Sequence, residues 1–322
     1  MLLVFISFLL GFSGSWLVKR FGTRIGMVDV PNLRSSHHRE IPKGAGFGIL
    51  SVLVVSGFFL SIPFFVWLPA LMISLASFWG ADKHILPVSY RLLIHFGCSL
   101  LFLVFFLHFQ QADPSAYVIW LPVLIFIVGT ANFYNFMDGI DGIAGITGVL
   151  AFLLVAVYAW MSGMPVSFIL LSLAMSAACL GFLCFSFPWA SVFLGDVGSI
   201  LLGFVFACIV IFLSRDLSDF LVMAGFLSMF YFDELFTMGV RIRDRDSLVE
   251  PHRKHIYQVL VNEAGIEHWK VALGYGLAQL TIGVSAILIQ PEGVWHLFVM
   301  YGVFALIFTG VAMAVRQRWA VR

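Results

Sequence analysis

Long apolar stretches separated by short polar segments make up almost the whole chain. Each stretch is about the length that an α-helix needs to cross a hydrocarbon core of ~30 Å at ~1.5 Å per residue. We predict membrane spans at residues 2–18, 46–61, 64–80, 92–109, 117–131, 143–160, 166–185, 198–213, 220–240, 271–289 and 294–315. The pattern therefore predicts an all-α, polytopic integral membrane protein with about 11 transmembrane helices.

The second and third predicted spans meet at Pro63. A proline at this point also fits one kinked hydrophobic hairpin, which would lower the count to 10. Isolated β-strands cannot satisfy their backbone groups in lipid, so helices are the expected spanning elements. We expect residues 1–322 to form one membrane-embedded domain, because the sequence contains neither an obvious internal repeat nor a polar domain.

Composition supports this interpretation. The 322 residues are 61% hydrophobic and only 11% charged, with 35 phenylalanines and a mean hydropathy of +1.02. This chain has too little polar surface to face water on all sides. The first apolar stretch carries its charges, Lys19 and Arg20, after it rather than before it, so we expect a retained span and not a cleaved signal. The cysteines all fall inside predicted spans and are expected to be packing residues.

The distribution of Lys and Arg predicts the orientation. With the spans above, 17 of the 18 basic residues fall on one side of the membrane, and Arg215 is the exception. This is the side that the first span reaches at its C-terminal end and that holds the chain's tail. Cytoplasmic loops carry such an excess. We therefore expect the N-terminus outside and the C-terminus inside, with five loops on the cytoplasmic face: 19–45, 80–91, 132–142, 186–198 and 241–270.

One of these loops contains the segment NFYNFMDGIDGIAG at 132–145. Its Asn132, Asn135, Asp138 and Asp141 recur every third residue, and a continuous α-helix would point the first and last apart. The glycines at 139 and 142 favour a break in the helix there. Oxygen ligands of this kind suit Mg²⁺, which usually shares them with phosphates. The alternative is that these residues are helix caps.

A second loop contains FLGDVGS at 193–199. Asp196 lies between two glycines at the start of the next span, where a helix N-terminus favours anions and Ser199 is placed to cap the helix. Phe193 offers a ring on which a base can stack. Alone this pattern is weak, but it gains weight beside the DGIDG loop.

The combination of NFYNFMDGIDGIAG, FLGDVGS and PHRKHIYQ resembles the polyprenyl-phosphate N-acetylhexosamine-1-phosphate transferase family. This resemblance runs from the loop PNLRSSHHREIPKGAG to the loop around His255, and the end loops look most like the bacterial branch that starts O-antigen or capsule chains. The family's reaction is attack of undecaprenyl phosphate on the β-phosphorus of a UDP-N-acetyl sugar, with release of UMP. The resemblance implies Mg²⁺, or Mn²⁺ as a substitute, and a bacterial cytoplasmic membrane with the active site facing the cytoplasm.

The resemblance also implies residue roles. Asp196 looks like the family's Mg²⁺-binding aspartate, with Asp138 and Asp141 beside the metal and the nucleotide. These three and Asp82 are the expected catalytic residues. Expected substrate contacts are His38, Arg39, Lys43, Asn132, Asn135, Phe193, His252, Arg253, His255, Tyr257 and Gln258. For Arg39 and Lys43 the alternative is a topology signal alone.

The chain departs from the family in two places. Relatives often read HIHH where this chain has His255, Ile256, Tyr257 and Gln258, so neutral groups stand in for the later histidines. Relatives also carry two adjacent aspartates nine residues before an arginine, whereas here Ala81 precedes Asp82. The loss of that carboxylate leaves three alternatives open: an acceptor that is already ionised, reduced activity, or a double role for Asp82 with Lys83.

Two other classes of function were weighed. A secondary transporter would also span the membrane many times, and the acidic pair Asp233 and Glu234 within a span is its best support. A catalytically inactive scaffold is suggested by Ala81. We expect a UDP-N-acetyl sugar, undecaprenyl phosphate and membrane lipid as partners and no nucleic acid, and the sequence leaves open whether the protein is a homodimer.

Overall fold

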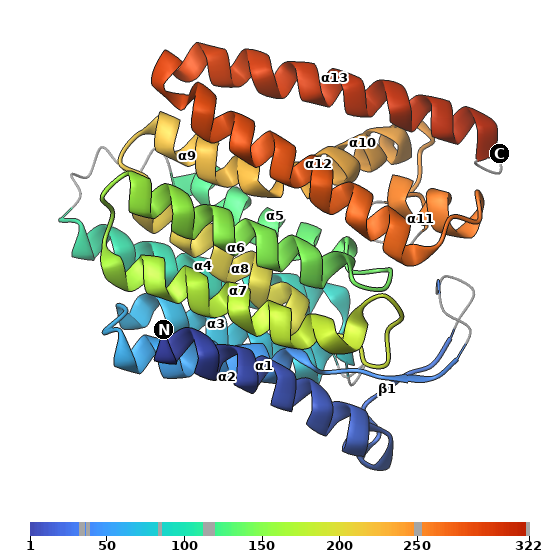
Figure 1. Ribbon diagram of the computed structural model, residues 1–322, viewed down its shortest axis with the longest axis horizontal. Helices are drawn as coiled ribbons and strands as arrows, with labels where there is room; N and C mark the ends of the chain where they lie inside the picture. Colours follow the sequence, from blue (N-terminus) through green and yellow to red (C-terminus); the bar gives the residue numbers. More distant parts are fainter. Residues whose placement is uncertain (32–35, 37–38, 83–85, 112–119, 248–252, 320–322) are drawn as a thin grey trace.

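The computed structural model describes residues 1–31, 36, 39–82, 86–111, 120–247 and 253–319, with the backbone alone for 81 and 82. Helices dominate these ranges (Figure 1). The α-helices are α1 (Leu2–Phe21), α2 (Gly46–Phe59), α3 (Phe64–Ser77), α4 (Val88–Phe109), α5 (Trp120–Phe136), α6 (Ile143–Met161), α7 (Val166–Ser186), α8 (Asp196–Leu213), α9 (Leu217–Ala224), α10 (Ser228–Arg243), α11 (Ile256–Asn262), α12 (His268–Ile289) and α13 (Val294–Trp319).

Short elements join these helices. The strands β1 (Val28–Asp29) and β2 (Ile41–Pro42) pair antiparallel, with Val28 opposite Pro42. One π-helical turn (Phe78–Asp82) follows α3. The remaining short helices are of the 3₁₀ type, at Gly22–Ile25, Gly225–Leu227 and Gln290–Glu292.

The predicted all-α, multi-pass architecture is confirmed. Within the described residues, eight helical segments are long and apolar enough to cross a membrane. Three shorter apolar segments, Gly46–Phe59, Phe64–Gly80 and Trp120–Phe136, stand beside them. The chain is therefore a polytopic membrane protein, while the count of eleven spans and the orientation stay predictions. The stretches on either side of Pro63 form two separate helices, α2 and α3.

One predicted boundary was wrong. The helix expected to end at 131 continues as α5 to Phe136, because its backbone ladder runs on into the polar segment. The span expected at 220–240 lies within one helical segment, Leu217–Arg243, that is long and apolar enough to cross a membrane. It divides into α9 and α10 at a 3₁₀ turn, Gly225–Leu227, and the turn's residues are buried rather than placed in a loop.

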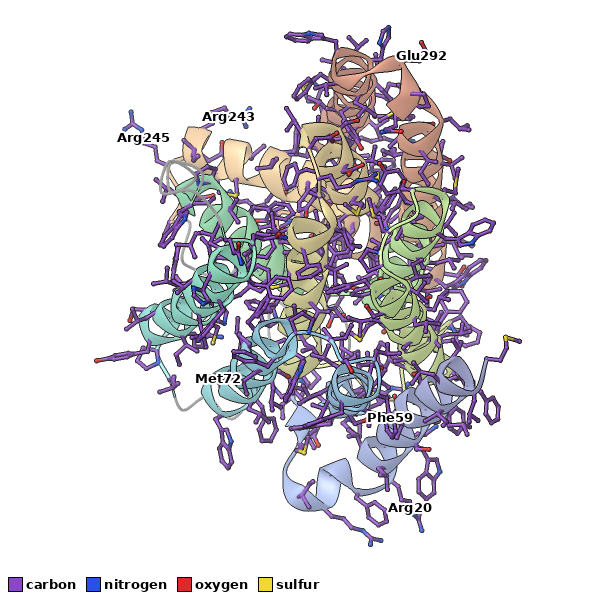
Figure 2. All side chains as sticks on the ribbon, turned by 90° about the vertical axis from the view of Figure 1, so that its left-hand side faces the viewer. Arg20, Phe59, Met72, Arg243, Arg245 and Glu292 are labelled. Carbon is purple, nitrogen blue, oxygen red and sulfur yellow. The ribbon has the colours of Figure 1, made fainter. Side chains whose placement is uncertain are left out.

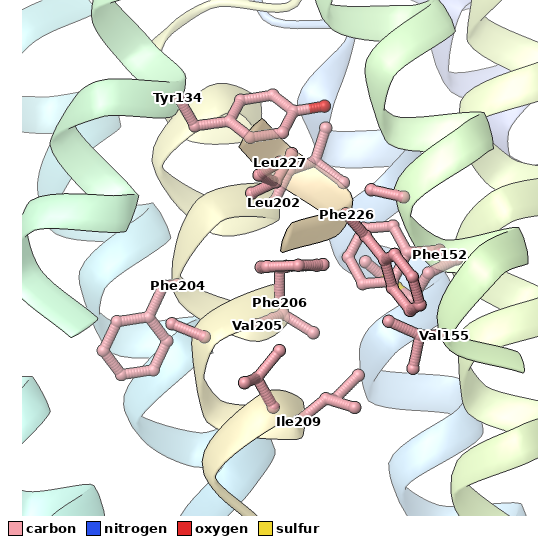
Figure 3. Packing of buried hydrophobic residues seen from close by; sticks show 14 of the residues in the cluster. Tyr134, Phe152, Val155, Leu202, Phe204, Val205, Phe206, Ile209, Phe226 and Leu227 are labelled. Carbon is pink, nitrogen blue, oxygen red and sulfur yellow. The ribbon is translucent and has the colours of Figure 1, made fainter. Parts of the chain in front are cut away.

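Helix α8 lies at the centre of the bundle. Its apolar side chains from Val197 to Val210 are almost all buried, since α2, α3, α5 and α6 pack around it. Figure 3 shows Phe204 and Phe206 of α8, with Phe206 close to Phe152 of α6 and Phe226 of the 3₁₀ turn. The rings of Phe152 and Phe206 meet edge to face at 6.1 Å. Such packing holds the start of α8, which carries Asp196, in a fixed place.

The outer surface is apolar, as expected for a protein surrounded by lipid. Phe59 of α2 and Met72 of α3, both labelled in Figure 2, have 81% and 48% of their surfaces exposed. At one end of the bundle lie β1, α11 and the C-terminal end of α13 (Figure 1). The loops that carry the candidate chemistry reach this same end.

Candidate functional site

The first predicted loop and the FLGDVGS loop are joined through their backbones. Phe193 donates its N–H to the carbonyl of Pro42 at 2.8 Å. Its own carbonyl accepts from the N–H groups of Gly44 and Ala45 at 3.0 and 3.1 Å. Lys43 and Phe193 thus form a short parallel bridge. This pairing places Lys43, predicted as a phosphate contact, beside the loop that leads to Asp196.

Asp196 occupies the first turn of α8 and faces a cation from another helix. A terminal nitrogen of Arg91, at the start of α4, lies 3.6 Å from a carboxylate oxygen of Asp196, and both side chains are 30% exposed. Among the described residues, the buried Nε of Arg91 has no hydrogen-bond partner. A partly exposed pair of this kind adds little stability. Part of each side chain is exposed at the start of α8.

Arg91 was not among the expected site residues. In the sequence it served only as a marker for the spacing to Asp82. Its only signal in the sequence was its position directly before the predicted span 92–109, and the contact with Asp196 emerges only when the helices pack.

Asn135 is the residue of the DGIDG segment that reaches α8. Its amide donates to the Ser199 hydroxyl at 2.8 Å. That hydroxyl in turn donates to the Gly195 carbonyl at 3.2 Å. Ser199 therefore links two helices and does not cap α8, which is a correction to the expected role. Asn135 of α5 thus contacts α8 one helical turn after Asp196, and this contact brings the two motifs together.

Asn132 faces a different neighbour. Its amide lies 3.2 Å from Nδ1 of His95 on α4 and donates to the Val128 carbonyl at 2.7 Å. The structure therefore places Asn132 against a buried histidine, away from the Asn135 and Ser199 contact.

The break between α5 and α6 falls where the glycines predicted it. Gly142 has φ +81°, a conformation that glycine adopts without strain. At Gly139 a Cβ would come within 2.2 Å of the Tyr257 hydroxyl. The loop carrying Asp138 and Asp141 is therefore shaped by a turn and by the close approach of α11.

Asp141 pairs with a histidine that the sequence analysis did not select. Nδ1 of His268, at the start of α12, lies 3.2 Å from the backbone nitrogen of Asp141 and 3.3 Å from its carboxylate. Both residues line a cavity of about 570 Å³ together with Arg39, Trp189 and Trp269. Arg39 also donates to the Ala190 carbonyl at 3.0 Å. The signal for His268 was its place directly before a predicted span, 271–289.

His255, an expected substrate contact, lies in the interior and not on the surface. Only 2% of its surface is exposed, and its ring nitrogens lie 3.6 Å from Asp233 and 3.4 Å from Glu234. Its ring stacks on that of Tyr257 at 5.6 Å. Gln258 is also buried, at 8% exposure. These residues pack beneath the loop surface.

Tyr257 supports the loop that carries Asp138. It is fully buried and donates its hydroxyl to the Phe136 carbonyl at 2.9 Å. Burial raises the pKa of this phenol well above its usual value, and the charges of Asp233 and Asp138 act in the same direction. The hydroxyl therefore stays protonated and keeps its bond to the end of α5.

The remaining expected residues are placed as follows. Lys43 lies 3.8 Å from Asp29 on β1. Arg253 lines a second cavity, between α10, α11 and α13, and not the cavity that contains Asp141. His38 and His252 lie outside the described residues, as does the side chain of Asp82, whose backbone ends the π-helical turn.

The donor set was tested against the expected Mg²⁺. Within the described part of the chain, no group of three or more His, Cys, Asp or Glu side chains lies close enough together to hold a metal ion. Mg²⁺ in phosphoryl-transfer sites is usually held by one or two carboxylates together with substrate phosphates and water. Asp138, Asp141 and Asp196 offer oxygen donors of the kind that such a shared ion takes, and among the described residues they form no cage built by the protein alone.

Comparison with known proteins gives two kinds of match. A family model described as glycosyl transferase family 4 matches residues 50–214, which include Asp138, Asp141 and Asp196. The probable undecaprenyl-phosphate N-acetylglucosaminyl 1-phosphate transferase of Bacillus subtilis (strain 168) is 27% identical over 303 residues, 88% of this chain and 84% of the relative.

Two further relatives show the same kinship. The phospho-N-acetylmuramoyl-pentapeptide-transferase of Staphylococcus saprophyticus is 34% identical over 188 residues, 56% of each chain. The undecaprenyl-phosphate alpha-N-acetylglucosaminyl 1-phosphate transferase of Thermotoga maritima is 25% identical over 264 residues, 79% of this chain and 78% of the relative.

Proposed function

This chain belongs to glycosyl transferase family 4, and from that membership we propose that it transfers an N-acetylhexosamine-1-phosphate from a UDP-sugar to undecaprenyl phosphate. The products are undecaprenyl-diphosphate-sugar and UMP. This step is the first membrane step in making an O-antigen or another polysaccharide of the cell envelope. It takes place at the cytoplasmic face of a bacterial inner membrane.

The observation that carries the proposal is the meeting of separate motifs at the start of α8. Asp196 lies 3.6 Å from Arg91, and Asn135 bonds Ser199 one turn further along. The same start of α8 follows the bridge between Lys43 and Phe193. Acidic, cationic and amide groups from four segments thus surround one helix N-terminus, which suits a diphosphate and its counterions.

In the proposed reaction one P–O bond forms and one breaks. An oxygen of the acceptor phosphate attacks the β-phosphorus of the donor, and the bond from that phosphorus to the bridging oxygen breaks, so UMP leaves. A phosphate monoester has its second pKa near ~6, so the acceptor already carries most of two charges at neutral pH. A strong general base is then not required, which is compatible with Ala81 in place of the family's first aspartate.

The chain's own residues have electrostatic and positioning roles. Arg91 and Lys43 neutralise phosphate charge as it moves toward the leaving nucleotide. Asn135 and Ser199 hold α5 against α8, and His268 holds the Asp141 loop. Phe193 offers its ring to the uracil.

We propose that Mg²⁺ is held by Asp196 with Asp138 or Asp141, and that Mn²⁺ can replace it. When bound, the ion neutralises charge on the diphosphate. Asp138 or Asp141 would hold the ion together with Asp196, and Arg91 would supply a further positive charge beside the phosphates.

The decisive experiment measures nucleotide release by the purified protein in detergent. Undecaprenyl phosphate, Mg²⁺ and one UDP-N-acetyl sugar at a time are supplied, with EDTA as the control. UMP that appears only with the lipid and disappears with EDTA is the expected result, and the active sugar identifies the donor.

Two other outcomes contradict the proposal. Release of UDP would mean transfer of the sugar alone. Neither nucleotide with any donor of a broad panel would favour a catalytically inactive scaffold, with Ala81 as its explanation.

A further inference from the structure

A second cavity lies apart from the site described above. It has a volume of about 960 Å³ and opens between the C-terminal ends of α10 and α13 and the short helix α11. None of its lining residues lines the cavity that contains Asp141. This cavity is therefore a separate feature at the same end of the bundle.

Its mouth is rich in cations. Among the described residues, Arg243, Arg253, Lys254 and Arg316 line it together with two acidic side chains, Asp244 and Glu263, and Lys254 also pairs with Asp246 outside the lining. The positive charge thus exceeds the negative charge around the opening. A cavity with such a mouth favours an anion.

The acidic side chains engage three of the four cations. Arg243 lies 3.1 Å from Asp244, Lys254 lies 3.4 Å from the same carboxylate, and Arg253 lies 3.8 Å from Glu263. The carboxyl group of Asp244 consequently has its pKa lowered, first through its hydrogen bond with Arg243. It stays ionised at neutral pH, and its charge is already paired with Arg243 and Lys254.

Arg316 differs from these three. Among the described residues it forms no ion pair, and it donates one hydrogen bond, of 3.2 Å, to the Lys254 carbonyl. That bond aims the guanidinium across the opening from α13 toward α11. Its charge is therefore left for a ligand.

Part of the cavity's lining is apolar. Phe236 and Val240 of α10, Val259 of α11 and Met313 of α13 line it. Half of the Met313 surface is exposed, and Phe236 meets Phe308 edge to face at 6.2 Å. A ligand that fits this cavity has an anionic head and an apolar tail.

The cavity also lies at the depth where such a ligand occurs. α13 is an apolar helix of 26 residues whose last turn carries Arg316 and Arg318, so this end is expected at the membrane surface. Figure 2 shows Arg243 and Arg245 on the outside of the bundle at the end of α10. Basic pockets between membrane helices recognise the head groups of anionic phospholipids.

We propose that this cavity binds an anionic phospholipid. Arg316 and Arg243 contact the phosphate, and an acyl chain lies along Phe236 and Met313. The bound lipid is neither donor nor acceptor in the transfer reaction, and it fastens α11 and its neighbouring loop to the ends of α10 and α13. The inference is independent of the proposed transferase reaction.

The test is native mass spectrometry of the purified full chain in detergent. The probes are phosphatidylglycerol, phosphatidylcholine with the same acyl chains, and inorganic phosphate. We expect phosphatidylglycerol to bind at least tenfold more tightly than phosphatidylcholine, and inorganic phosphate at millimolar concentration not to displace it.

Variants locate the binding. Because each basic residue near the surface is worth ~1 kcal/mol of lipid binding, Arg316→Gln and Arg243→Gln should each weaken phosphatidylglycerol binding about fivefold, and together about thirtyfold. The matched control is Arg318→Gln, which removes the same charge from the same helix outside the cavity and should change binding less than twofold. Arg316→Lys, which keeps the charge, should also bind within about twofold, and thermal unfolding in detergent checks that each variant is folded.

Three results would overturn the proposal. Equal binding of the two phospholipids would show that the cavity does not recognise the head group. Unchanged affinity in the folded double variant would place the lipid elsewhere. Displacement of phosphatidylglycerol by inorganic phosphate would make the cavity a site for small anions.

Discussion

At the scale of single residues, Asp196 has the role best supported by position. It begins α8, its carboxylate lies 3.6 Å from Arg91, and both are accessible. We expect Asp196→Asn to lower turnover about a hundredfold or more, since the variant removes a charge beside the reacting phosphates. The protein should still insert and fold, as measured by thermal unfolding in detergent.

The matched control is Glu292→Gln, the same change at the opposite end of α12 from His268. Its turnover should equal that of the wild type. Normal turnover in Asp196→Asn would remove this carboxylate from metal binding and from the reaction.

His268 gives a second prediction at this scale. Its Nδ1 lies 3.2 Å from the backbone nitrogen of Asp141 and 3.3 Å from the Asp141 carboxylate, so it is placed to orient Asp141. Loss of a partner that orients a metal ligand typically costs 10–100-fold in metal affinity or activity. His268→Ala should therefore raise the Mg²⁺ concentration needed for half-maximal UMP release about tenfold.

Glu267→Gln serves as the comparison, because Glu267 lines the same cavity but pairs with Lys270. It should leave the Mg²⁺ requirement unchanged. An unaltered requirement in His268→Ala would reduce its contact with Asp141 to packing.

At the scale of elements, Asp233 holds α11 in place. Its carboxylate accepts from the backbone N–H groups of Ile256 and Tyr257 at 2.9 and 3.2 Å, from the Tyr275 hydroxyl at 2.6 Å and from Thr237 at 3.1 Å. A negative charge at a helix N-terminus is favourable. Asp233, one of the two acidic residues that supported the transporter alternative, thus caps the N-terminus of α11.

Asp233→Ala should destabilise the protein by about 3 kcal/mol or more, since it leaves buried donors without an acceptor. The unfolding midpoint in detergent measures this. Glu234→Gln is the neighbouring control, with a smaller expected loss because Glu234 forms an ion pair only with His255 among the residues that the structure describes. Equal midpoints for Asp233→Ala and the wild type would show that α11 is held by its apolar contacts alone.

The break after α5 was predictable at this scale, but its place was not. Glycines at 139 and 142 indicated a turn, and a turn occurs there. The helix nevertheless reaches Phe136, so Asn132 and Asn135 stand on one helix and contact different partners. Sequence spacing shows that neighbouring side chains diverge, but not which helices receive them.

At the scale of the whole molecule, the orientation can be tested directly. Basic residues follow the ends of α1, α10 and α13, whose C-terminal ends lie toward one side of the bundle (Figure 1). Arg215 is held at the other end, where it donates to the Ser162 carbonyl and to Asp219. Charge asymmetry of this kind keeps the basic end in the cytoplasm.

We therefore expect a fluorescent protein fused to the C-terminus to be bright, and alkaline phosphatase inserted at Gly163, between α6 and α7, to be active. The reverse pair of results would place the site loops outside the cytoplasm. That placement would separate the site loops from any nucleotide-sugar donor in the cytoplasm.

The amino-acid sequence by itself determined that this protein is a helical membrane protein, because apolar length and the distribution of Lys and Arg act locally along the chain. It also determined the acidic segments, since Asp138, Asp141 and Asp196 are recognisable from their glycine neighbours. Only the tertiary structure decided that Arg91 meets Asp196, that His268 meets Asp141, and that His255 and Tyr257 are buried. These contacts join segments far apart in sequence, and they depend on how apolar helices pack, which a one-dimensional pattern does not specify.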